Sequence, residues 1–359
     1  KRTPLYHNHL KLNARMVAFG GWDMPVQYEG ILSEHQQTRS ACAVFDICHM
    51  GEFIVKGDAV VTGLDRLVSM RIVDMPVSSC RYGFLLNDRG TVLDDLIIFR
   101  VAKEEWFLVV NGATTDKDAA HFRKNLKQPS AFKDISPDTG KIDVQGPNAR
   151  EVMKDFGFDL SSLEYYHFDH FEWKGHSLLI SRTGYTGELG YEIYCPWELT
   201  EQIWNQLLTD SRVKPAGLGA RDVLRLEVGY PLYGHELSEE ITPLEAGLKK
   251  FVDFEKDFIG KEALLKQQTN GVSRSLVGFM SENRRAPRGE QKIFSEDHRQ
   301  IGLVVSGTFS PVLQKGIGLA FVEKSAAVVG QKIYFGDDKQ KNFAMICPKM
   351  FFKEGSLKA

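Results

Sequence analysis

The sequence lacks any hydrophobic run of the roughly 20 residues that a membrane-spanning helix requires, so we expect no membrane partner for its 359 residues. The opening segment Lys1–Pro4 also lacks the apolar core of a signal peptide. A targeting segment removed earlier stays compatible with this start. We therefore expect a protein of the cytoplasm, or of the mitochondrial matrix if such a segment has been removed.

Cysteine is scarce, and its spacing excludes a disulfide framework. The five cysteines include no C-x-x-C pair, and an odd, scattered set favours reduced, buried thiols. They are Cys42, Cys48, Cys80, Cys195 and Cys347. The histidine pairs His7/His9 and His167/His170 have no acid or thiolate set at a recognised metal-binding spacing, so no metal is expected.

An excess of charge of either sign is also missing. The formal net charge is −2, which gives no overall field that would attract nucleic acid. Hydrophobic residues make up 43% and charged residues 26% of the chain, as is ordinary for a globular protein. The length exceeds that of one ordinary core and indicates about two or three domains.

Several catalytic and nucleotide-binding motifs are absent. There is no G-x-S-x-G nucleophile motif. The spacing of Gly184, Gly187 and Gly190 matches neither a phosphate-binding loop nor a dinucleotide fingerprint. These glycines either form turns or let the backbone approach a flat ligand closely.

The pattern of residues 51–138 predicts an inserted module. Strands are expected over 52–56, 82–86, 93–101, 106–110 and 132–135. Helices are expected over about 58–68, capped by Asp58, and from Thr115 to about Leu126. This order is close to the split β-α-β of ferredoxin-like modules. After about Lys266 the residue pattern is typical of short β-strands separated by turns, which predicts a C-terminal barrel or sandwich.

Two adjacent acids open the strand that follows the turn at Asn87–Gly90. Side chains alternate along a strand, so Asp94 and Asp95 point to opposite faces. Asp95 shares its face with Ile97 and Phe99. An acid at the end of an apolar face is either a solvent-exposed polar residue of the turn or a side chain positioned for catalysis.

Two further charged residues are candidates for ligand binding. Glu192 lies on an expected strand, where it either accepts the paired N–H groups of a pterin or guanine ring or forms a salt bridge with Arg182 or Lys174. Arg221 lies at a glycine-rich helix start with Arg225 one turn below it, which suits a carboxylate ligand. The alternative partners of Arg221 are Asp222 and Glu227.

Nine blocks in one order along the chain resemble the aminomethyltransferase (T-protein) family of the glycine cleavage system. These blocks are Thr3–Tyr6, Met16–Trp22, Phe45–Gly51, Gly90–Leu96, Val144–Pro147, Ser181–Glu192, Gly217–Glu227, Leu232–Gly234 and Ser306–Pro311. They span nearly the whole chain.

The resemblance implies an α+β fold with three domains, arranged like a cloverleaf around a central folate channel. The first domain would be discontinuous, over residues 1–50 and 139–265. The ferredoxin-like module would be inserted at residues 51–138, and residues 266–359 would form the C-terminal β domain.

The resemblance also implies a reaction. The family takes an aminomethyl group from the lipoylated H-protein and gives the one-carbon unit to tetrahydrofolate as co-substrate, while ammonia leaves. Asp95 matches the family's catalytic carboxylate, Glu192 its pterin-binding glutamate and Arg221 its folate-tail arginine. The other matches to folate-binding positions are Asn111, Val110, Met50, Tyr185 and Arg288.

Two departures from the family pattern stand out. Cys48 replaces a serine, and the family's folate-contacting tyrosine near the C-terminus has no match in residues 351–359.

The alternatives to the aminomethyltransferase function are a tetrahydrofolate-dependent demethylase on the same scaffold and a non-enzymatic folate-binding paralogue of iron–sulfur assembly. The block Gly184–Gly187 and the adjacent Asp94 and Asp95 favour the aminomethyltransferase.

Overall fold

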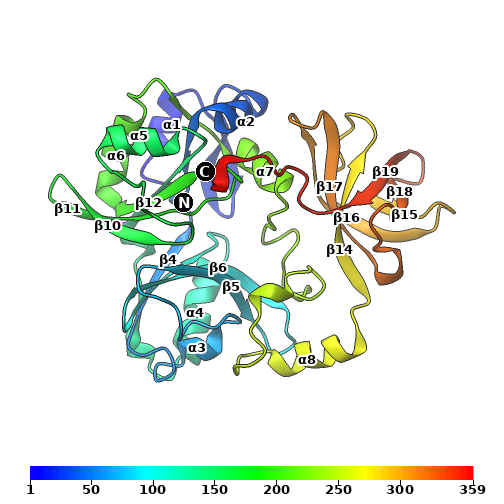
Figure 1. Cartoon of the computed structure of the whole chain (residues 1–359), viewed down its shortest axis with the longest axis horizontal. Helices are drawn as coiled ribbons and strands as arrows, with labels where there is room; N and C mark the ends of the chain where they lie inside the picture. The colour runs from blue at the N-terminus through cyan, green and yellow to red at the C-terminus, as the bar shows by residue number, and fades with distance from the viewer. Residues whose placement is uncertain (359) are drawn as a thin grey trace. The chain divides into compact units, whose positions relative to one another are not determined.

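The computed structural model describes residues 1–358, and its strands and helices confirm the expected α+β class (Figure 1). By compactness the chain divides into two units. The first unit consists of residues 1–83, 95–221 and 355–359, and the second of residues 84–94 and 222–354. The chain therefore passes between the units four times. The predicted division into three domains, with its boundaries, stays a prediction.

The first unit contains a six-stranded sheet in the order β10-β11-β12-β9-β3-β13. The strands are β3 (Cys42–Asp46), β9 (Thr139–Gln145), β10 (Phe168–Trp173), β11 (His176–Ser181), β12 (Gly190–Pro196) and β13 (Val213–Pro215). A two-stranded hairpin, β1 (Arg15–Phe19) and β2 (Trp22–Gln27), belongs to the same unit. The α-helices that lie wholly in this unit and outside residues 51–138 are α1 (Tyr6–Lys11), α2 (Ile31–Ser40), α5 (Ala149–Phe156) and α6 (Thr200–Leu207).

The core of this sheet forms where apolar residues alternate on β9, β11 and β12. Ile142 and Val144 on β9 pack with Tyr191 and Ile193 on β12, and Trp204 of α6 joins the cluster. The residues between them on β9, including Lys141 and Asp143, are directed to the opposite face of the sheet. That face carries the candidate site.

The predicted inserted module forms a five-stranded sheet in the order β5-β6-β7-β4-β8. Its strands are β4 (Gly51–Lys56), β5 (Cys80–Leu86), β6 (Val92–Ala102), β7 (Glu105–Val110) and β8 (Phe132–Asp134), with helix α4 at Thr115–Asn125. Because β4 lies between β7 and β8, the sheet has the crossover that a split β-α-β requires. Residues 84–94, around the hairpin turn, count with the second unit.

The helix expected over residues 58–68 is wrong in extent. Only α3 (Leu64–Leu67) is helical, and Val60 and Val61 are more than half exposed. The Asp58 side chain accepts the backbone N–H groups of Val60 and Val61, as a cap does. The cap therefore closes a turn that does not continue into a helix, because the two following valines have no core to pack against.

The two sheets of the first unit share an aromatic core. Phe99 of β6 and Phe107 of β7 contact Tyr194 of β12 edge to face, with ring centroids 5.6 and 5.1 Å apart. Phe168 of β10 packs against Phe99 at 5.3 Å. This packing fixes the face of β6 that carries Asp95 against the six-stranded sheet.

The second unit contains a closed barrel of six strands, drawn in yellow to red in Figure 1, which confirms the barrel alternative for the C-terminal segment. The strands are β14 (Arg274–Ser281), β15 (Lys292–Phe294), β16 (Gln300–Ser310), β17 (Lys315–Glu323), β18 (Lys332–Gly336) and β19 (Lys341–Cys347). Helix α8 is Lys261–Asn270, and α7 (Leu218–Glu227) begins in the first unit and ends in the second. Within residues 1–358, no helix is long and apolar enough to cross a membrane.

Candidate functional site

Asp95 is held in place by two side-chain donors. It is half-buried on β6, while the preceding Asp94 is fully buried, as the predicted alternation requires. The Tyr82 hydroxyl donates to Oδ2 of Asp95 at 2.8 Å, and Nδ2 of Asn111 donates to Oδ1 at 2.8 Å. Burial and the nearby Asp95 charge raise the pKa of Tyr82, so its hydroxyl stays a donor.

Strand register brings two more predicted residues beside Asp95. Leu96 of β6 is opposite Val110 of β7, and Val110 is opposite Gly51 of β4. Asp95, Asn111 and Met50 each lie one residue beyond this row, at the same end of three neighbouring strands. The predicted site residues of the module therefore gather at one end of these three strands.

Glu192 is a buried carboxylate on β12 with three side-chain partners. Its Oε1 lies 3.1 Å from Nζ of Lys141, and Oε2 accepts the hydroxyls of Thr183 at 2.5 Å and Tyr194 at 3.3 Å. Burial alone would raise its pKa, but Lys141, Thr183 and Arg221 together hold the pKa of Glu192 below its usual value. The alternative salt bridges to Arg182 or Lys174 do not form; Arg182 donates to the Leu163 carbonyl instead.

Arg221 lies in the first turn of α7, and its partner is Asp143. Nη1 of Arg221 donates to Oδ2 of Asp143, so neither Asp222 nor Glu227 is the partner of this arginine. The guanidinium also lies over the ring of Tyr185, 5.0 Å from its centroid. Arg221 therefore combines a charged contact with an aromatic one.

The two charged pairs are adjacent across the sheet. Glu192 of β12 is directly opposite Asp143 of β9. Burial raises the pKa of Asp143 to about 6, although Arg221 opposes this shift, and the neighbouring Glu192 carboxylate adds to it. Two carboxylates and the two cations Lys141 and Arg221 thus form one compact buried group.

The glycines of residues 184–190 make room for a side chain of the protein itself. A Cβ at Gly184 or Gly190 would come within 2.3 or 2.0 Å of the Gln145 amide. That amide donates to Asp143 at 2.5 Å and accepts from Thr186 at 2.6 Å. The need for glycine at these two positions therefore comes from Gln145.

Two observations connect the Asp95 group with the Glu192 group inside the first unit. Nζ of Lys141 lies 3.5 Å from Sδ of Met50, which precedes β4. Burial and Asp95 raise the pKa of the Tyr82 hydroxyl most, and Tyr185, whose ring lies under the Arg221 guanidinium, adds to this shift. Arg288 belongs to the second unit, where its side chain is exposed, and its predicted role stays a prediction.

The sequence reasoning missed Lys141 and Asp143. The signal that could have found them is two charges at i and i+2 on an otherwise apolar strand before Val144–Pro147. Arg225, by contrast, is not placed for a ligand. It is 1% exposed and pairs with Glu236 at 2.9 Å and Asp222 at 2.9 Å in the second unit.

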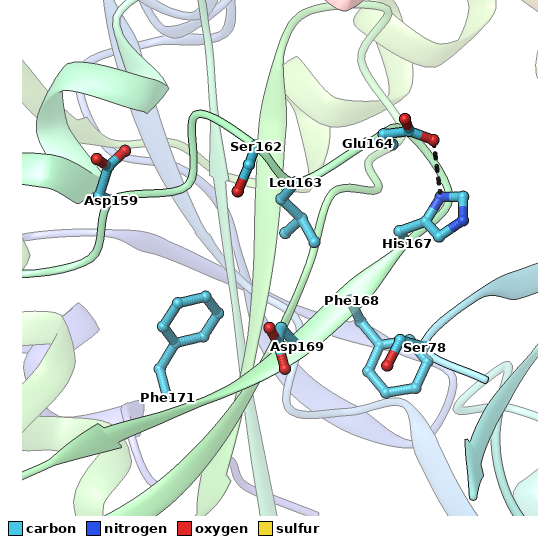
Figure 2. Close-up of a pocket in the computed structure, with 9 residues that line it drawn as sticks. All are labelled: Ser78, Asp159, Ser162, Leu163, Glu164, His167, Phe168, Asp169 and Phe171. Carbon is cyan, nitrogen blue, oxygen red and sulfur yellow. Dashed lines mark ion pairs between the residues drawn. The ribbon is translucent and has the colours of Figure 1, made fainter.

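A surface pocket of about 300 Å³ lies elsewhere in the first unit (Figure 2). Its acids Asp159, Glu164 and Asp169 are exposed, and Glu164 lies 4.0 Å from the His167 ring. None of the predicted site residues lines it. We give it no part in the candidate site.

Across residues 1–358, no group of three metal-ligating side chains is positioned to hold a metal ion.

Comparisons with known proteins cover almost the whole chain. Residues 5–256 match the family described as the GCVT N-terminal domain, and residues 274–353 match the glycine cleavage T-protein C-terminal barrel domain. The chain is 41% identical to the aminomethyltransferase of Thermoanaerobacter pseudethanolicus, over 99% of this chain and 98% of that protein. It is also 41% identical to the aminomethyltransferase of Pseudothermotoga lettingae, over 100% of this chain and 99% of that protein.

A solved structure is similar over the same extent. The glycine cleavage system aminomethyltransferase T from Bartonella henselae aligns with a TM-score of 0.92 and 32% identity, covering 99% of both chains. At this identity and coverage the likeness extends to both units of the chain.

Proposed function

Since the chain belongs to the glycine cleavage T-protein family, we propose that it is the aminomethyltransferase of the glycine cleavage system. It transfers the one-carbon unit from the aminomethyl-dihydrolipoyl arm of the H-protein to tetrahydrofolate. The products are methylenetetrahydrofolate, ammonia and dihydrolipoyl H-protein. The observation that carries this proposal is the match to aminomethyltransferases over 99% of the chain.

The chemistry of the buried site suits tetrahydrofolate as a substrate. A reduced pterin presents adjacent N–H donors, and the ionised Glu192 carboxylate accepts such a pair. The folate tail is anionic, and Arg221 has N–H donors beyond the nitrogen that it gives to Asp143. We assign pterin binding to Glu192 and tail binding to Arg221, with Tyr185, Asn111, Val110, Met50 and Arg288 as further ligand contacts.

We assign the catalytic role to Asp95. Tyr82 and Asn111 fix both of its oxygens, so the carboxylate keeps one orientation without reorganising during the reaction. A carboxylate in this position orients the attacking folate nitrogen and stabilises the positive charge that develops as ammonia leaves. Such an electrostatic effect contributes on the order of 2–4 kcal/mol to the barrier.

The first test is an Asp95→Asn variant, with Asp95→Ala as a second substitution. We expect methylenetetrahydrofolate formation from aminomethylated H-protein to fall by about 100-fold or more. Binding of tetrahydrofolate, measured by calorimetry, should remain within a few fold of the parent protein. Full transfer activity in a folded variant would remove Asp95 from the mechanism.

Product analysis separates this function from its alternatives. The aminomethyltransferase forms methylenetetrahydrofolate and ammonia, whereas a demethylase on this scaffold would form methyltetrahydrofolate. A folate-binding paralogue without activity would bind tetrahydrofolate and transfer nothing. The absence of tetrahydrofolate binding by the parent protein would defeat all three.

A further inference from the structure

Strand β9 carries two buried charges that the assigned mechanism does not use. Lys141 and Asp143 lie two residues apart on one face of the strand and are 1% and 0% exposed. Each contacts one of the two residues to which we assign ligand binding. Lys141 contacts Glu192, and Asp143 contacts Arg221.

We propose that Lys141 and Asp143 are positioning residues: each is a built-in counter-ion that fixes the charge and the orientation of one ligand-binding group. Lys141 keeps Glu192 available as an acceptor, and Asp143 competes with the anionic end of the ligand for Arg221. The proposal rests on the proposed function, because it takes tetrahydrofolate as the ligand of Glu192 and Arg221.

The case for Lys141 follows from the burial of Glu192. A buried carboxylate keeps its charge only if cations or donors compensate the loss of water. Lys141 is the only cation within 4.0 Å of Glu192 among residues 1–358, and Thr183 and Tyr194 are neutral donors. Without Lys141 the carboxyl takes up a proton at neutral pH and can no longer accept two N–H groups from a pterin.

The case for Asp143 follows from the contacts of Arg221. Asp143 binds one terminal nitrogen of the guanidinium and itself accepts the Gln145 amide. The Arg221 side chain is 14% exposed, so its remaining donors can reach a ligand. Because the Asp143 charge already neutralises Arg221, an anionic ligand gains less there than it would from a free arginine.

Ionisable groups from several packed elements belong to this cluster or face it. They are Lys141 and Asp143 of β9, Glu192 and Tyr194 of β12, Arg221 of α7, Cys42 of β3, Glu52 of β4, Cys80 of β5 and His49 before β4. Burial raises the pKa of Glu52 and of both thiols and lowers that of His49 to about 4. At neutral pH the two thiols and His49 are uncharged, and burial favours the neutral form of Glu52, so the compensating charges come from Lys141 and Arg221.

The first experiment uses Lys141→Met, which replaces the lysine with a neutral side chain of similar length. The control is Lys141→Arg, which retains the charge. Tetrahydrofolate affinity is measured by calorimetry from pH 6 to pH 9. We expect Lys141→Met to bind about tenfold more weakly or worse at pH 7 and to recover affinity as the pH rises. Lys141→Arg should restore binding at pH 7.

Transfer kinetics supply a readout that a merely structural role would not give. Lys141→Met should raise the KM for tetrahydrofolate and leave kcat nearly unchanged, since Lys141 does not touch the reacting atoms. A variant that binds as the parent does over the whole pH range, or that loses kcat and stability together at unchanged KM, overturns the role of Lys141.

The second experiment is Asp143→Asn, which keeps the shape and removes the charge. We expect severalfold tighter binding of tetrahydrofolate at pH 7.5, and no change for a tetrahydropterin that lacks the glutamate tail. In the parent protein, affinity should rise as the pH falls from 7.5 to 5.5 and Asp143 gains a proton, and the variant should lack this rise. Equal or weaker binding by Asp143→Asn overturns the competition.

The parent protein keeps the test of Asp143 decisive if the Asp143→Asn variant fails to fold. A parent affinity that does not change between pH 7.5 and pH 5.5 contradicts the role of Asp143 without any substitution. If the parent does not bind tetrahydrofolate, the proposed function fails. If the parent binds and transfers while folded variants match it, only this inference fails.

Discussion

At the scale of single residues, the position of Asp95 depends on two neutral donors. Tyr82 and Asn111 each bind one carboxylate oxygen at 2.8 Å. A hydrogen bond to a charged group typically contributes more than one between neutral groups. The orientation of the carboxylate is therefore expected to be as important to turnover as its presence.

We predict that Tyr82→Phe lowers kcat by roughly tenfold or more, because it removes a hydrogen bond to a charged group. The matched control is Tyr191→Phe, since the Tyr191 hydroxyl is buried in the first unit and finds no hydrogen-bond partner in the described part of the chain, residues 1–358. The control should keep full activity and equal or higher thermal stability. Both proteins are compared by steady-state transfer and thermal unfolding, and equal kcat values for the two would show that Tyr82 does not orient Asp95.

A second residue-scale prediction concerns Glu52, which is fully buried on β4. Residues 1–358 supply no hydrogen-bond partner for either of its carboxyl oxygens. Burial raises its pKa well above the usual value. The folded protein therefore favours the protonated form, so stability is greatest below the unfolded pKa and is lost as the pH rises toward the folded pKa.

For Glu52→Gln we expect that loss to disappear, with a gain over the parent of at least about 1 kcal/mol at the high-pH end. The measurement is urea unfolding of both proteins from pH 4.5 to pH 8. Parallel pH profiles for the two would contradict a protonated Glu52.

At the scale of elements, the segment from Arg182 to Glu192 is shaped by Gln145. The amide of Gln145 occupies the space beside Gly184 and Gly190, and it links Asp143 of β9 with Thr186 of the glycine-rich segment. The rigidity of this segment comes from these hydrogen bonds across the sheet.

We predict that Gly190→Ala destabilises the protein by about 2 kcal/mol, because its Cβ would displace the Gln145 amide. The matched control is Gly289→Ala, whose Cβ would meet nothing nearer than 3.5 Å and should change stability by less than about 0.5 kcal/mol. Thermal unfolding compares them.

Elements with clear periodicity could be predicted from the sequence, and elements that depend on distant partners could not. The hairpin around Asn87–Gly90 and the alternation of Asp94 and Asp95 follow from local patterns. The helix at 58–68 was wrong because Val60 and Val61 remain exposed.

The candidate site was only partly predictable, because its ion pairs join residues that are distant in the sequence. Asp95, Glu192 and Arg221 were identified from the sequence blocks, but the ion-pair partners of the last two were not. Lys141 and Asp143 precede Glu192 and Arg221 by 51 and 78 positions along the chain. The register of β9 against β12 brings Lys141 and Asp143 beside Glu192, and helix α7 brings Arg221 to Asp143.

At the scale of the whole molecule, the thiols report on the integrity of both units. Cys42, Cys48, Cys80 and Cys195 are buried, and Cys347 is half-buried. Burial raises the pKa of Cys42 and Cys195 to about 12 and that of Cys347 to about 11. A thiol that stays protonated reacts slowly with disulfide reagents.

We therefore predict that the folded protein at pH 8 exposes at most one reactive thiol, and that denaturant releases all five. Titration with a chromogenic disulfide measures both states. Cys347→Ser should abolish the reactivity of the folded protein. Rapid reaction of two or more thiols without denaturant would contradict the packing of these residues.

The path of the chain through its two units bears on how the protein matures. Residues 355–358 return to the first unit, where Ser356 donates to the Glu188 carboxylate at 2.5 Å and accepts the backbone N–H of Leu189. A nascent chain leaving the ribosome cannot make these contacts until the intervening 222–354 stretch has been synthesised. The glycine-rich segment thus gains these hydrogen bonds only after Ser356 has been synthesised. A product that terminates before this residue would contain Asp95 and Glu192 but would lack the contacts that hold the segment beside them.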